Sequence, residues 1–307
     1  MTILITGGTG MVGTALTKAL VATGHRVRIL TRDPSKSKAS PGISYYAWNP
    51  AAQTMDTAAV EGADAIVHLA GANVAEGRWT DKRKKEIVDS RVQSGQLLVK
   101  TVKEASNNIK TIISASAIGW YGPDPQVPNP RPFREGDPPD AAFLGATCRQ
   151  WEEAIETVTQ LGKRLVIYRI GIVLSREGGA YTEFRKPLRF GLATVLGNGA
   201  QMISWIHIDD MVRLLIEALE NDSLSGIYNA VADSPVSNRH LVKTIATIKG
   251  SFYITAPVPA AALKIALGEM SVEVLKSATV SNEKIRSAGF AVGYPTIDKA
   301  VAQLEGT

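Results

Sequence analysis

Three glycines near the amino terminus have the spacing of a loop that binds phosphate groups. They stand at positions i, i+3 and i+6 in the stretch Gly7-Gly8-Thr9-Gly10-Met11-Val12-Gly13. The first permits a tight turn, the second lets the backbone approach a pyrophosphate, and the third allows a helix to pack closely on a strand. The following helix would point its free N–H groups and positive dipole end at the anion. We predict a dinucleotide site with contacts from Gly7, Thr9, Gly10, Met11, Val12 and Gly13.

The residue type at the end of the second expected strand distinguishes two nicotinamide cofactors. Proteins that bind NAD usually carry an acidic residue there, which holds the ribose 2′-hydroxyl. This chain has Thr31-Arg32 instead, and a guanidinium forms forked, charge-assisted hydrogen bonds with a phosphate. Asp33 follows one position later and is the competing signal. We predict NADP(H), with Thr31 and Arg32 in contact with its adenosine phosphate; the alternative is that Arg32 is a solvated loop charge.

The elements that must position these residues alternate between apolar strands and amphipathic helices. We expect strands at residues 3–5, 27–30, 65–69, 111–114 and 165–170, and helices at 11–21, 80–105 and 143–161. Such alternation is typical of a parallel sheet with helices on both faces. The sequence therefore predicts an α/β fold with a doubly wound parallel sheet of the Rossmann type, which binds NAD(P).

The remainder of the chain is less regular. Residues 119–140 hold seven prolines and no apolar period, which indicates a long loop of the kind that is usually functional. Only short elements are expected after Gly171. We predict an NADP-binding domain over residues 1–170 and a smaller mixed α/β substrate-binding region over residues 171–307, interleaved with the first.

The composition of the 307 residues fits a globular protein, with 45% hydrophobic and 21% charged residues. The net charge of +5 is too small to indicate a nucleic-acid partner. One cysteine, Cys148, and four scattered histidines offer neither a disulfide framework nor the spacing of a metal site. Because there is no membrane-spanning run and no signal peptide, we expect a cytoplasmic protein without a membrane partner.

Several motifs resemble those of the extended short-chain dehydrogenase/reductases, namely the glycine spacing, His68-Leu69-Ala70-Gly71, Ser114-Ala115-Ser116 and the stretch from Trp205 to Asp210. More narrowly, the chain resembles the atypical YfcH-type epimerase-family proteins, which are nucleoside-diphosphate-sugar epimerase-like. The motifs that carry this resemblance are Leu69–Asn73 before Gly77-Arg78-Trp79, Ser114–Gly119 before Tyr121-Gly122, and Trp151-Glu152. The segment from Pro257 to Pro295 resembles the C-terminal domain of unknown function in that group.

The resemblance implies roles for individual residues. Leu69, Ala70 and Gly71 would form the strand end beside the nucleotide ribose. Ser114 and Ser116 would end the strand that carries the catalytic serine in ordinary members, and Ser116 is our choice for that serine. Ordinary members also use a Tyr and a Lys four residues later on one helix, where the ammonium lowers the pKa of the phenol. This chain has Leu144 and Cys148 at the corresponding positions, or Phe143 and Thr147 one register earlier, so the usual proton-transfer pair is missing.

Other residues are candidates for the missing chemistry and for substrate binding. Tyr121 follows Ser116 closely and is the expected replacement phenol, with an aromatic that closes the pocket as the alternative. Asn73, Arg91, Trp120 and His207 are the candidate substrate-binding residues. His207 has a structural alternative, in which Asp209 or Asp210 caps a helix that begins at about Met211.

Two functions from different classes follow. The first is an NADP(H)-dependent oxidoreductase-like or epimerase-like enzyme that acts on a small hydroxyl or carbonyl compound, such as a nucleotide sugar. The alternative is a catalytically impaired protein that binds NADPH as a sensor or binds a protein partner. The sequence leaves the oligomeric state open, a homodimer included.

Overall fold

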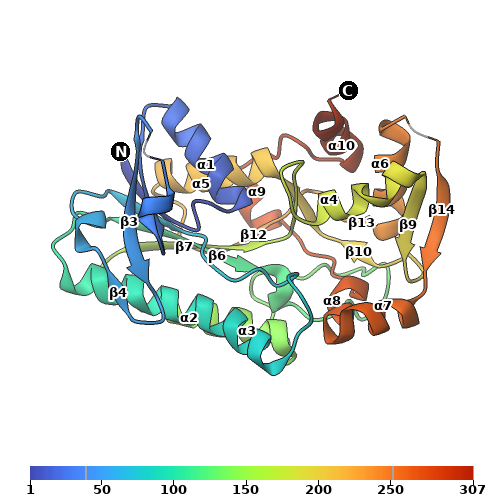
Figure 1. Ribbon diagram of the computed structural model, residues 1–307, viewed down its shortest axis with the longest axis horizontal. Coiled ribbons are helices and arrows are strands. Elements are labelled where there is room, and N and C mark those ends of the chain that lie inside the picture. Colours follow the sequence, from blue (N-terminus) through green and yellow to red (C-terminus); the bar gives the residue numbers. More distant parts are fainter. Residues whose placement is uncertain (39, 251, 307) are drawn as a thin grey trace.

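The computed structural model describes residues 1–38, 40–250 and 252–306. Eight strands form its central sheet: β1 Thr2–Thr6, β2 Arg26–Thr31, β3 Ile43–Asn49, β4 Thr54–Met55, β5 Ala65–His68, β6 Thr111–Ala117, β7 Arg164–Ile170 and β12 Gly226–Ala230. Their order is β12-β7-β6-β5-β1-β2-β3-β4 (Figure 1). Neighbouring strands run parallel except for the antiparallel pair β3–β4. The predicted parallel sheet is confirmed.

Helices cover both faces of this sheet. α1 (Met11–Ala22) and α5 (Ile208–Glu220) lie on one face, and α2 (Asp81–Glu104) and α3 (Phe143–Glu156) lie on the other (Figure 1). Successive residues of a strand point to opposite faces, so Ile3 and Ile5 pack with the α1 side while Leu4 packs with the α2 side. Both faces are dry, which explains why β1 is an unbroken apolar run. No helix in the described ranges has the length and hydropathy needed to cross a lipid bilayer.

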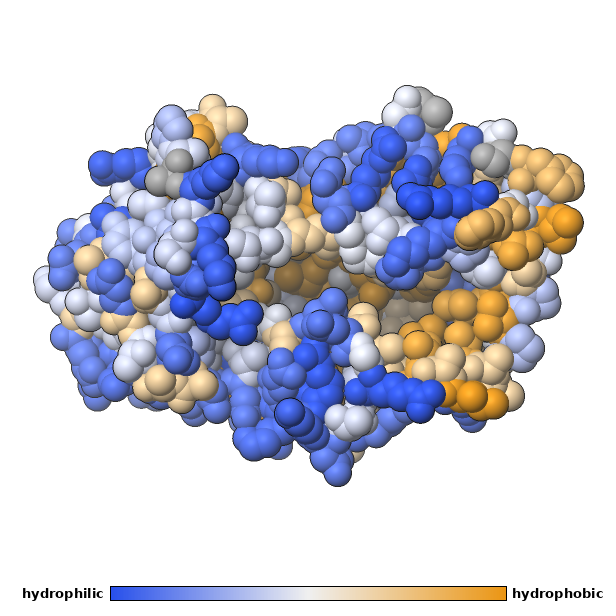
Figure 2. All heavy atoms as spheres, viewed as in Figure 1, coloured by the Kyte–Doolittle hydropathy of each residue, from blue (hydrophilic) through white to orange (hydrophobic). Residues whose placement is uncertain are grey.

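The C-terminal region, residues 171–306, contributes elements to the sheet domain and also forms a second core. β12 and α5 come from beyond residue 170, so the chain returns to the first sheet; the division at that residue stays a prediction. The second core contains Leu174, Trp205, Leu241 and Val301. The remaining elements are β8 Ile172–Leu174, α4 Ala180–Arg185, β9 Leu192–Leu196, β10 Met202–Ile203, β11 Trp205–His207, β13 Val236–Ser237, α6 Asn238–Ile248, β14 Ile254–Val258, α7 Ala260–Leu267, α8 Ser271–Leu275, α9 Glu283–Ser287 and α10 Ile297–Glu305. Figure 2 shows a hollow between the two halves of the molecule.

The start of α5 differs from the sequence prediction. The helix begins at Ile208, not near Met211, and its N-cap is His207, whose Nδ1 accepts the backbone N–H of Asp209 at 3.1 Å. The buried carboxylate of Asp210 instead accepts the backbone N–H groups of Gly293 and Tyr294, at 2.8 and 3.0 Å. The predicted cap by Asp209 or Asp210 is therefore wrong. Asp210 instead connects α5 to the loop at Gly293 and Tyr294.

The long proline-rich segment, residues 121–142, contains neither a helix nor a strand. Asp124 attaches it to the C-terminal region by accepting hydrogen bonds from the hydroxyls of Ser277 and Thr279, at 2.7 and 2.8 Å. The predicted loop is confirmed, and it is held in place by side chains 150 residues further along the chain.

Candidate functional site

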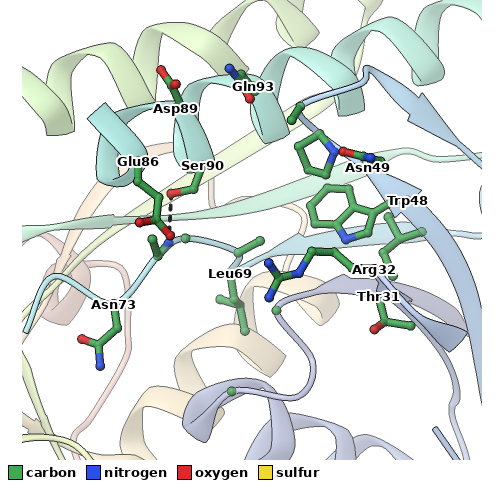
Figure 3. Close-up of a pocket in the computed structure, with 18 of the residues that line it drawn as sticks. Thr31, Arg32, Trp48, Asn49, Leu69, Asn73, Glu86, Asp89, Ser90 and Gln93 are labelled. Carbon is green, nitrogen blue, oxygen red and sulfur yellow. Dashed lines mark hydrogen bonds between the residues drawn. The ribbon is translucent and has the colours of Figure 1, made fainter. Parts of the chain in front are cut away.

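A cleft of about 800 Å³ opens at the carboxyl edge of the sheet (Figure 3). Its floor comes from the turns after β1, β2, β3 and β5, and the first turns of α2 form one wall. Ligands of open parallel sheets bind at this edge, because strand ends and helix N-termini meet there. The cleft brings together nine of the residues singled out in the sequence: Gly7, Thr9, Gly10, Thr31, Arg32, Leu69, Ala70, Gly71 and Asn73.

The glycine turn has the shape that its sequence predicts. Gly7 has φ of +69°, and a β-carbon there would stand 2.8 Å from the backbone of Leu69. A β-carbon on Gly13 would stand 2.3 Å from the Gly7 carbonyl oxygen, so α1 packs tightly on the turn. Gly10 differs, because the only atom near its missing side chain is that same oxygen, at 3.3 Å. The space beside Gly10 therefore faces the cleft at the N-terminus of α1, where an anion is favoured.

Arg32 is an exposed cation at the end of β2. Its side chain is exposed and points into the cleft, below Trp48 and toward Leu69 in the view of Figure 3. It forms no ion pair or hydrogen bond with any residue in the described part of the chain. A guanidinium at this position can donate charge-assisted hydrogen bonds to a phosphate of a ligand.

Asp33, the competing signal, is used within its own loop. Its carboxylate caps a short 3₁₀ turn at Pro34–Lys36, accepts the backbone N–H of Ser35 at 3.1 Å and pairs with Lys36 at 3.1 Å. Hydrogen bonds from Ser35 and Lys36 hold its pKa below the usual value. Asp33 is absent from the lining of the cleft, whereas Arg32 lines it.

Part of the cleft wall was missed from the sequence. Trp48 and Asn49 end β3, and Ser90 and Gln93 lie on the face of α2 that lines the cleft (Figure 3). Ser90 holds the loop after β5 by accepting the backbone N–H of Ala72 at 2.9 Å. The signal for β3 was present, since the aromatic run Ile43–Asn49 lies between Pro41-Gly42 and Pro50, and such turn residues bound a strand.

Four other residues predicted to contact the cofactor lie outside the lining of this cleft: Met11, Val12, Gly13 and Ser114. Val12 packs against the core on the α1 side. Met11 is directed at the C-terminal region, since its Cε lies 3.4 Å from where a β-carbon on Gly179 would stand. The Ser114 hydroxyl is buried and donates to the Ala115 carbonyl at 3.2 Å.

Ser116 belongs to a buried polar network beneath α3. Its hydroxyl donates to Glu152 Oε1 at 2.6 Å, and Glu152 also accepts Arg169 Nε and Nη2, at 2.8 and 2.9 Å. Ser116 and Arg169 are neighbours on β6 and β7. All three side chains are at least nine-tenths buried. A hydroxyl has one hydrogen, so in this arrangement Ser116 can accept a hydrogen bond from a ligand but cannot donate one.

Tyr121 and Trp120 complete this network instead of lining the cleft. The Tyr121 side chain is fully buried, and its hydroxyl donates to Asn229 Oδ1 at 2.7 Å and accepts Arg169 Nη1 at 3.2 Å. Burial raises the pKa of Tyr121 to about 12. The Trp120 ring lies 3.6 Å below the Arg169 guanidinium, and its Nε1 donates to the Asp137 carbonyl at 2.9 Å. These placements do not support the expected proton transfer by Tyr121 or substrate stacking by Trp120.

Cys148 and Arg91 lie between α2 and α3, on the Gly71 side of the cleft. Cys148 is 3% exposed, and burial raises the pKa of its thiol to about 11, so the group stays neutral. Arg91 is also buried, and its Cζ is 3.1 Å from where a β-carbon on Gly71 would stand. The thiol of Cys148 is therefore neutral, and a cation from α2 lies nearby.

His207 has a structural environment. It is fully buried, its Nε2 lies 2.9 Å from Gln303 Oε1, and its ring packs against Tyr294 at a centroid distance of 3.9 Å. Burial lowers the pKa of His207. Because both ring nitrogens have partners within the protein, the expected contact between His207 and a substrate is not supported.

The sheet order, the glycine turn and the cleft at the strand ends define a protein with a Rossmann-type doubly wound fold. A profile of the NAD dependent epimerase/dehydratase family matches residues 3–230, and a profile of a domain of unknown function, DUF1731, matches residues 258–304. The chain belongs to the NAD dependent epimerase/dehydratase family. This confirms the family resemblance of the sequence motifs.

The relatives of this chain include several that are named as epimerase family proteins. "Epimerase family protein SSP1921" of Staphylococcus saprophyticus is 35% identical over 306 residues, which are 98% of each chain. "Epimerase family protein ML0860" of Mycobacterium leprae is 34% identical and covers 98% of this chain and 94% of its own. Among solved structures, human epimerase family protein SDR39U1 with NADPH has a TM-score of 0.87 at 29% identity, with full coverage of both chains. A nucleoside-diphosphate sugar epimerase from Corynebacterium glutamicum is 32% identical with a TM-score of 0.77 and matches over 58% of its length.

Proposed function

We propose that this protein binds NADP(H) in the cleft and acts as an oxidoreductase-like or epimerase-like enzyme on a small hydroxyl or carbonyl compound, such as a nucleotide sugar. The observation that carries the proposal is Arg32, which lines the cleft at the end of β2 without an ion pair or hydrogen bond to any described residue, together with a glycine turn that is open at Gly10. NADPH in the similar human structure supports this choice of cofactor. Bound NADP(H) would supply or accept a hydride.

Two parts of the cleft would each bind one anionic group of NADP(H). The turn from Gly7 to Gly10 and the N-terminus of α1 fit a pyrophosphate. Arg32 fits the adenosine 2′-phosphate, because its guanidinium has no competing carboxylate. Trp48 and Gln93 line the same end of the cleft and would border the adenine.

Binding of NADPH and NADH to the wild type and to Arg32→Ala tests the choice of cofactor. Removing a charge-assisted contact should weaken NADPH by about 10- to 100-fold, equivalent to about 1–3 kcal/mol, and should leave NADH within about twofold. Lys38→Ala is the matched control, since Lys38 is an exposed cation of the same loop that does not line the cleft. Equal affinity of the wild type for both cofactors would contradict the proposal.

For the chemistry, Ser116 remains our candidate for contact with the substrate, through its acceptor lone pairs. The buried pair Glu152–Arg169 would hold its hydroxyl in that orientation. Tyr121 has no exposed surface and a pKa of about 12, so a proton would come from the substrate or a water. Ser116→Ala should lower turnover of any substrate found while NADPH binding is kept. A fully active Ser116→Ala would remove Ser116 from the proposal.

A second function has support from α3. Its residues at the positions of the usual catalytic pair are Leu144, which packs with Trp79 and Met270, and the neutral Cys148. This apolar surface favours a protein that binds NADPH as a ligand and does little chemistry. Incubation with NADPH and a panel of nucleotide sugars and small carbonyl compounds separates the two functions. Loss of the reduced nicotinamide absorbance with any compound, or conversion of a nucleotide sugar into its epimer seen by NMR with either oxidation state of the cofactor, supports the enzyme. Ligand binding with neither change supports the sensor.

A further inference from the structure

Exposed apolar side chains gather at one end of the C-terminal region. Of the nine large apolar side chains that are exposed in the described ranges, five lie on β9, β14 and α7 or directly before these strands: Phe190, Leu192, Phe252, Ile254 and Ile265. The two phenylalanines are 82% and 85% exposed. Figure 2 shows apolar surface at this end of the molecule. Apolar side chains gathered in this way are typical of an interaction surface.

The strand β14 has an open edge beside these side chains. β14 and β9 run parallel and form a sheet of two strands, in which the Ile254 N–H donates to the Gly191 carbonyl at 2.8 Å. Alternate residues of a paired strand turn their backbone groups to the same side, so those of Tyr253, Thr255 and Pro257 lie at the other edge. No described residue accepts the N–H of Tyr253 or Thr255 there. An open edge is a template for pairing with another strand.

A second copy of β14 fits this edge in an antiparallel register. With Thr255 opposite Thr255 of the second copy, the two residues exchange both of their backbone hydrogen bonds. Pro257 then lies opposite Tyr253, whose N–H meets the Pro257 carbonyl, so the N–H that proline lacks leaves only the Tyr253 carbonyl unbonded. Ile254 lies beside the small Ala256 of the second copy. β14 carries no charged residue, so no like charges meet across the pair.

The same pairing covers the apolar side chains at both ends of β14. Phe190 and Phe252 lie at its amino end, where the Phe252 carbonyl oxygen is 3.4 Å from where a β-carbon on Gly191 would stand. α7, which carries Ile265, follows its carboxyl end. In an antiparallel pair the phenylalanines of each copy therefore approach α7 of the other. The five side chains expose on the order of 600 Å² per copy, and a stable interface buries about 800 Å² per partner.

We propose that this protein forms a two-fold symmetric dimer through β14, which joins the β9–β14 sheets of two copies into one continuous sheet. The open edge and the apolar side chains lie together and are complementary to themselves, as the same surface on both subunits of such a dimer must be. A lipid surface fits less well, because the backbone groups of the open edge would stay unbonded in hydrocarbon. The proposal is independent of the cofactor and the chemistry proposed above.

Sedimentation velocity over a range of protein concentrations tests the dimer. Ile254→Lys places a charge at the centre of the interface and should weaken dimerisation at least about tenfold. The matched control is Val272→Lys, since Val272 is 58% exposed, Ile254 is 60% exposed, and Val272 lies on α8, which Figure 1 shows on the side of α7 away from β14. The control should leave the dimerisation constant within about twofold. Thermal unfolding of each variant checks that it is folded.

A disulfide between two copies tests the register. Opposite residues of a hydrogen-bonded antiparallel pair have Cα atoms about 5.5 Å apart, a distance that a disulfide can span. Thr255→Cys should therefore form a covalent dimer under mild oxidation. Thr54→Cys is the control, since Thr54 is an exposed threonine of β4, an edge strand of the main sheet, and it should stay unlinked. The native Cys148 is buried and does not compete.

A wild type that stays monomeric at about 100 μM would overturn the proposal, because interfaces of standard size bind with micromolar or higher affinity. A dimer that Ile254→Lys leaves intact also overturns it, as does a Thr255→Cys variant that links no faster than Thr54→Cys. A monomeric wild type that sediments with vesicles of anionic phospholipid assigns the surface to a membrane instead. If Ile254→Lys fails to fold, Phe252→Ser is measured in its place, because a side chain that is 85% exposed contributes little to the monomer.

Discussion

Replacing Glu152 with glutamine should destabilise this protein strongly, because it leaves Arg169 buried without a counter-charge. The two side chains are 8% and 1% exposed and share two hydrogen bonds of 2.8 and 2.9 Å. Removing one partner of such a pair typically costs about 3–5 kcal/mol. The amide keeps the shape of the carboxylate and can still accept from Ser116, so no cavity contributes. We expect a loss of about 3 kcal/mol in the free energy of unfolding.

Urea unfolding followed by tryptophan fluorescence measures this loss. Glu153→Gln is the matched control, since Glu153 is the next residue of α3 and its partner Arg149 lies 3.8 Å away with both side chains more than half exposed. Exposed pairs of this kind contribute little, so the control should change stability by less than about 0.5 kcal/mol. The double variant Glu152→Gln/Arg169→Met should lose less than the sum of the single variants, by about 1–3 kcal/mol. A Glu152→Gln loss of under about 1 kcal/mol would refute the reasoning that this pair is dry and strongly coupled.

Three further predictions concern single residues. Gly10→Val should abolish NADPH binding and keep the fold, because Gly10 has φ of −78° and its side-chain position faces the cleft; binding at wild-type affinity would show that the turn is only structural. The free energy of unfolding should fall by up to about 1.4 kcal/mol per pH unit as the pH drops from about 6.5 toward 4, because the folded state keeps His68 neutral while the unfolded chain takes up a proton. Denaturant unfolding of His68→Gln should show a flatter dependence of this free energy on pH. An unchanged dependence would exclude His68 as the cause. Iodoacetamide at neutral pH should alkylate Cys148 at least about 100-fold more slowly in the folded than in the unfolded protein, because the thiol is buried and has a pKa of about 11. Comparable alkylation rates in the two states would show that the thiol is accessible.

Much of the sheet domain could be predicted from the sequence, because its signals are local. A strand buried on both faces must be apolar throughout, and the runs around Ile3–Ile5 and Ala65–His68 show this directly. β3 was missed because it lies near the sheet edge and is only half buried, so its aromatic residues do not form a continuous apolar run. The helix after β11 was placed three residues late, because the residue that caps it is a histidine held by Gln303.

The candidate site, too, could be predicted from the sequence only in part. The spacing of Gly7, Gly10 and Gly13 by itself determined a nucleotide turn, since each glycine answers a backbone constraint within one strand–turn–helix unit. Sequence order also brought Arg32 to the strand end, but only the structure showed that Asp33 is turned into its own loop.

Which polar residues face a ligand was decided by tertiary structure alone. Tyr121 stands five residues after Ser116, yet its hydroxyl is buried against Asn229, 108 residues away. Arg91 was one charge on a long, highly charged helix, and what packs around it from α3 and the loop after β5 leaves it without a carboxylate partner among the described residues. Burial and partner choice depend on residues far apart in the chain. The sequence therefore determined the fold and the nucleotide turn of this protein, and the packing of distant segments decided which of its charges remain available to bind a ligand.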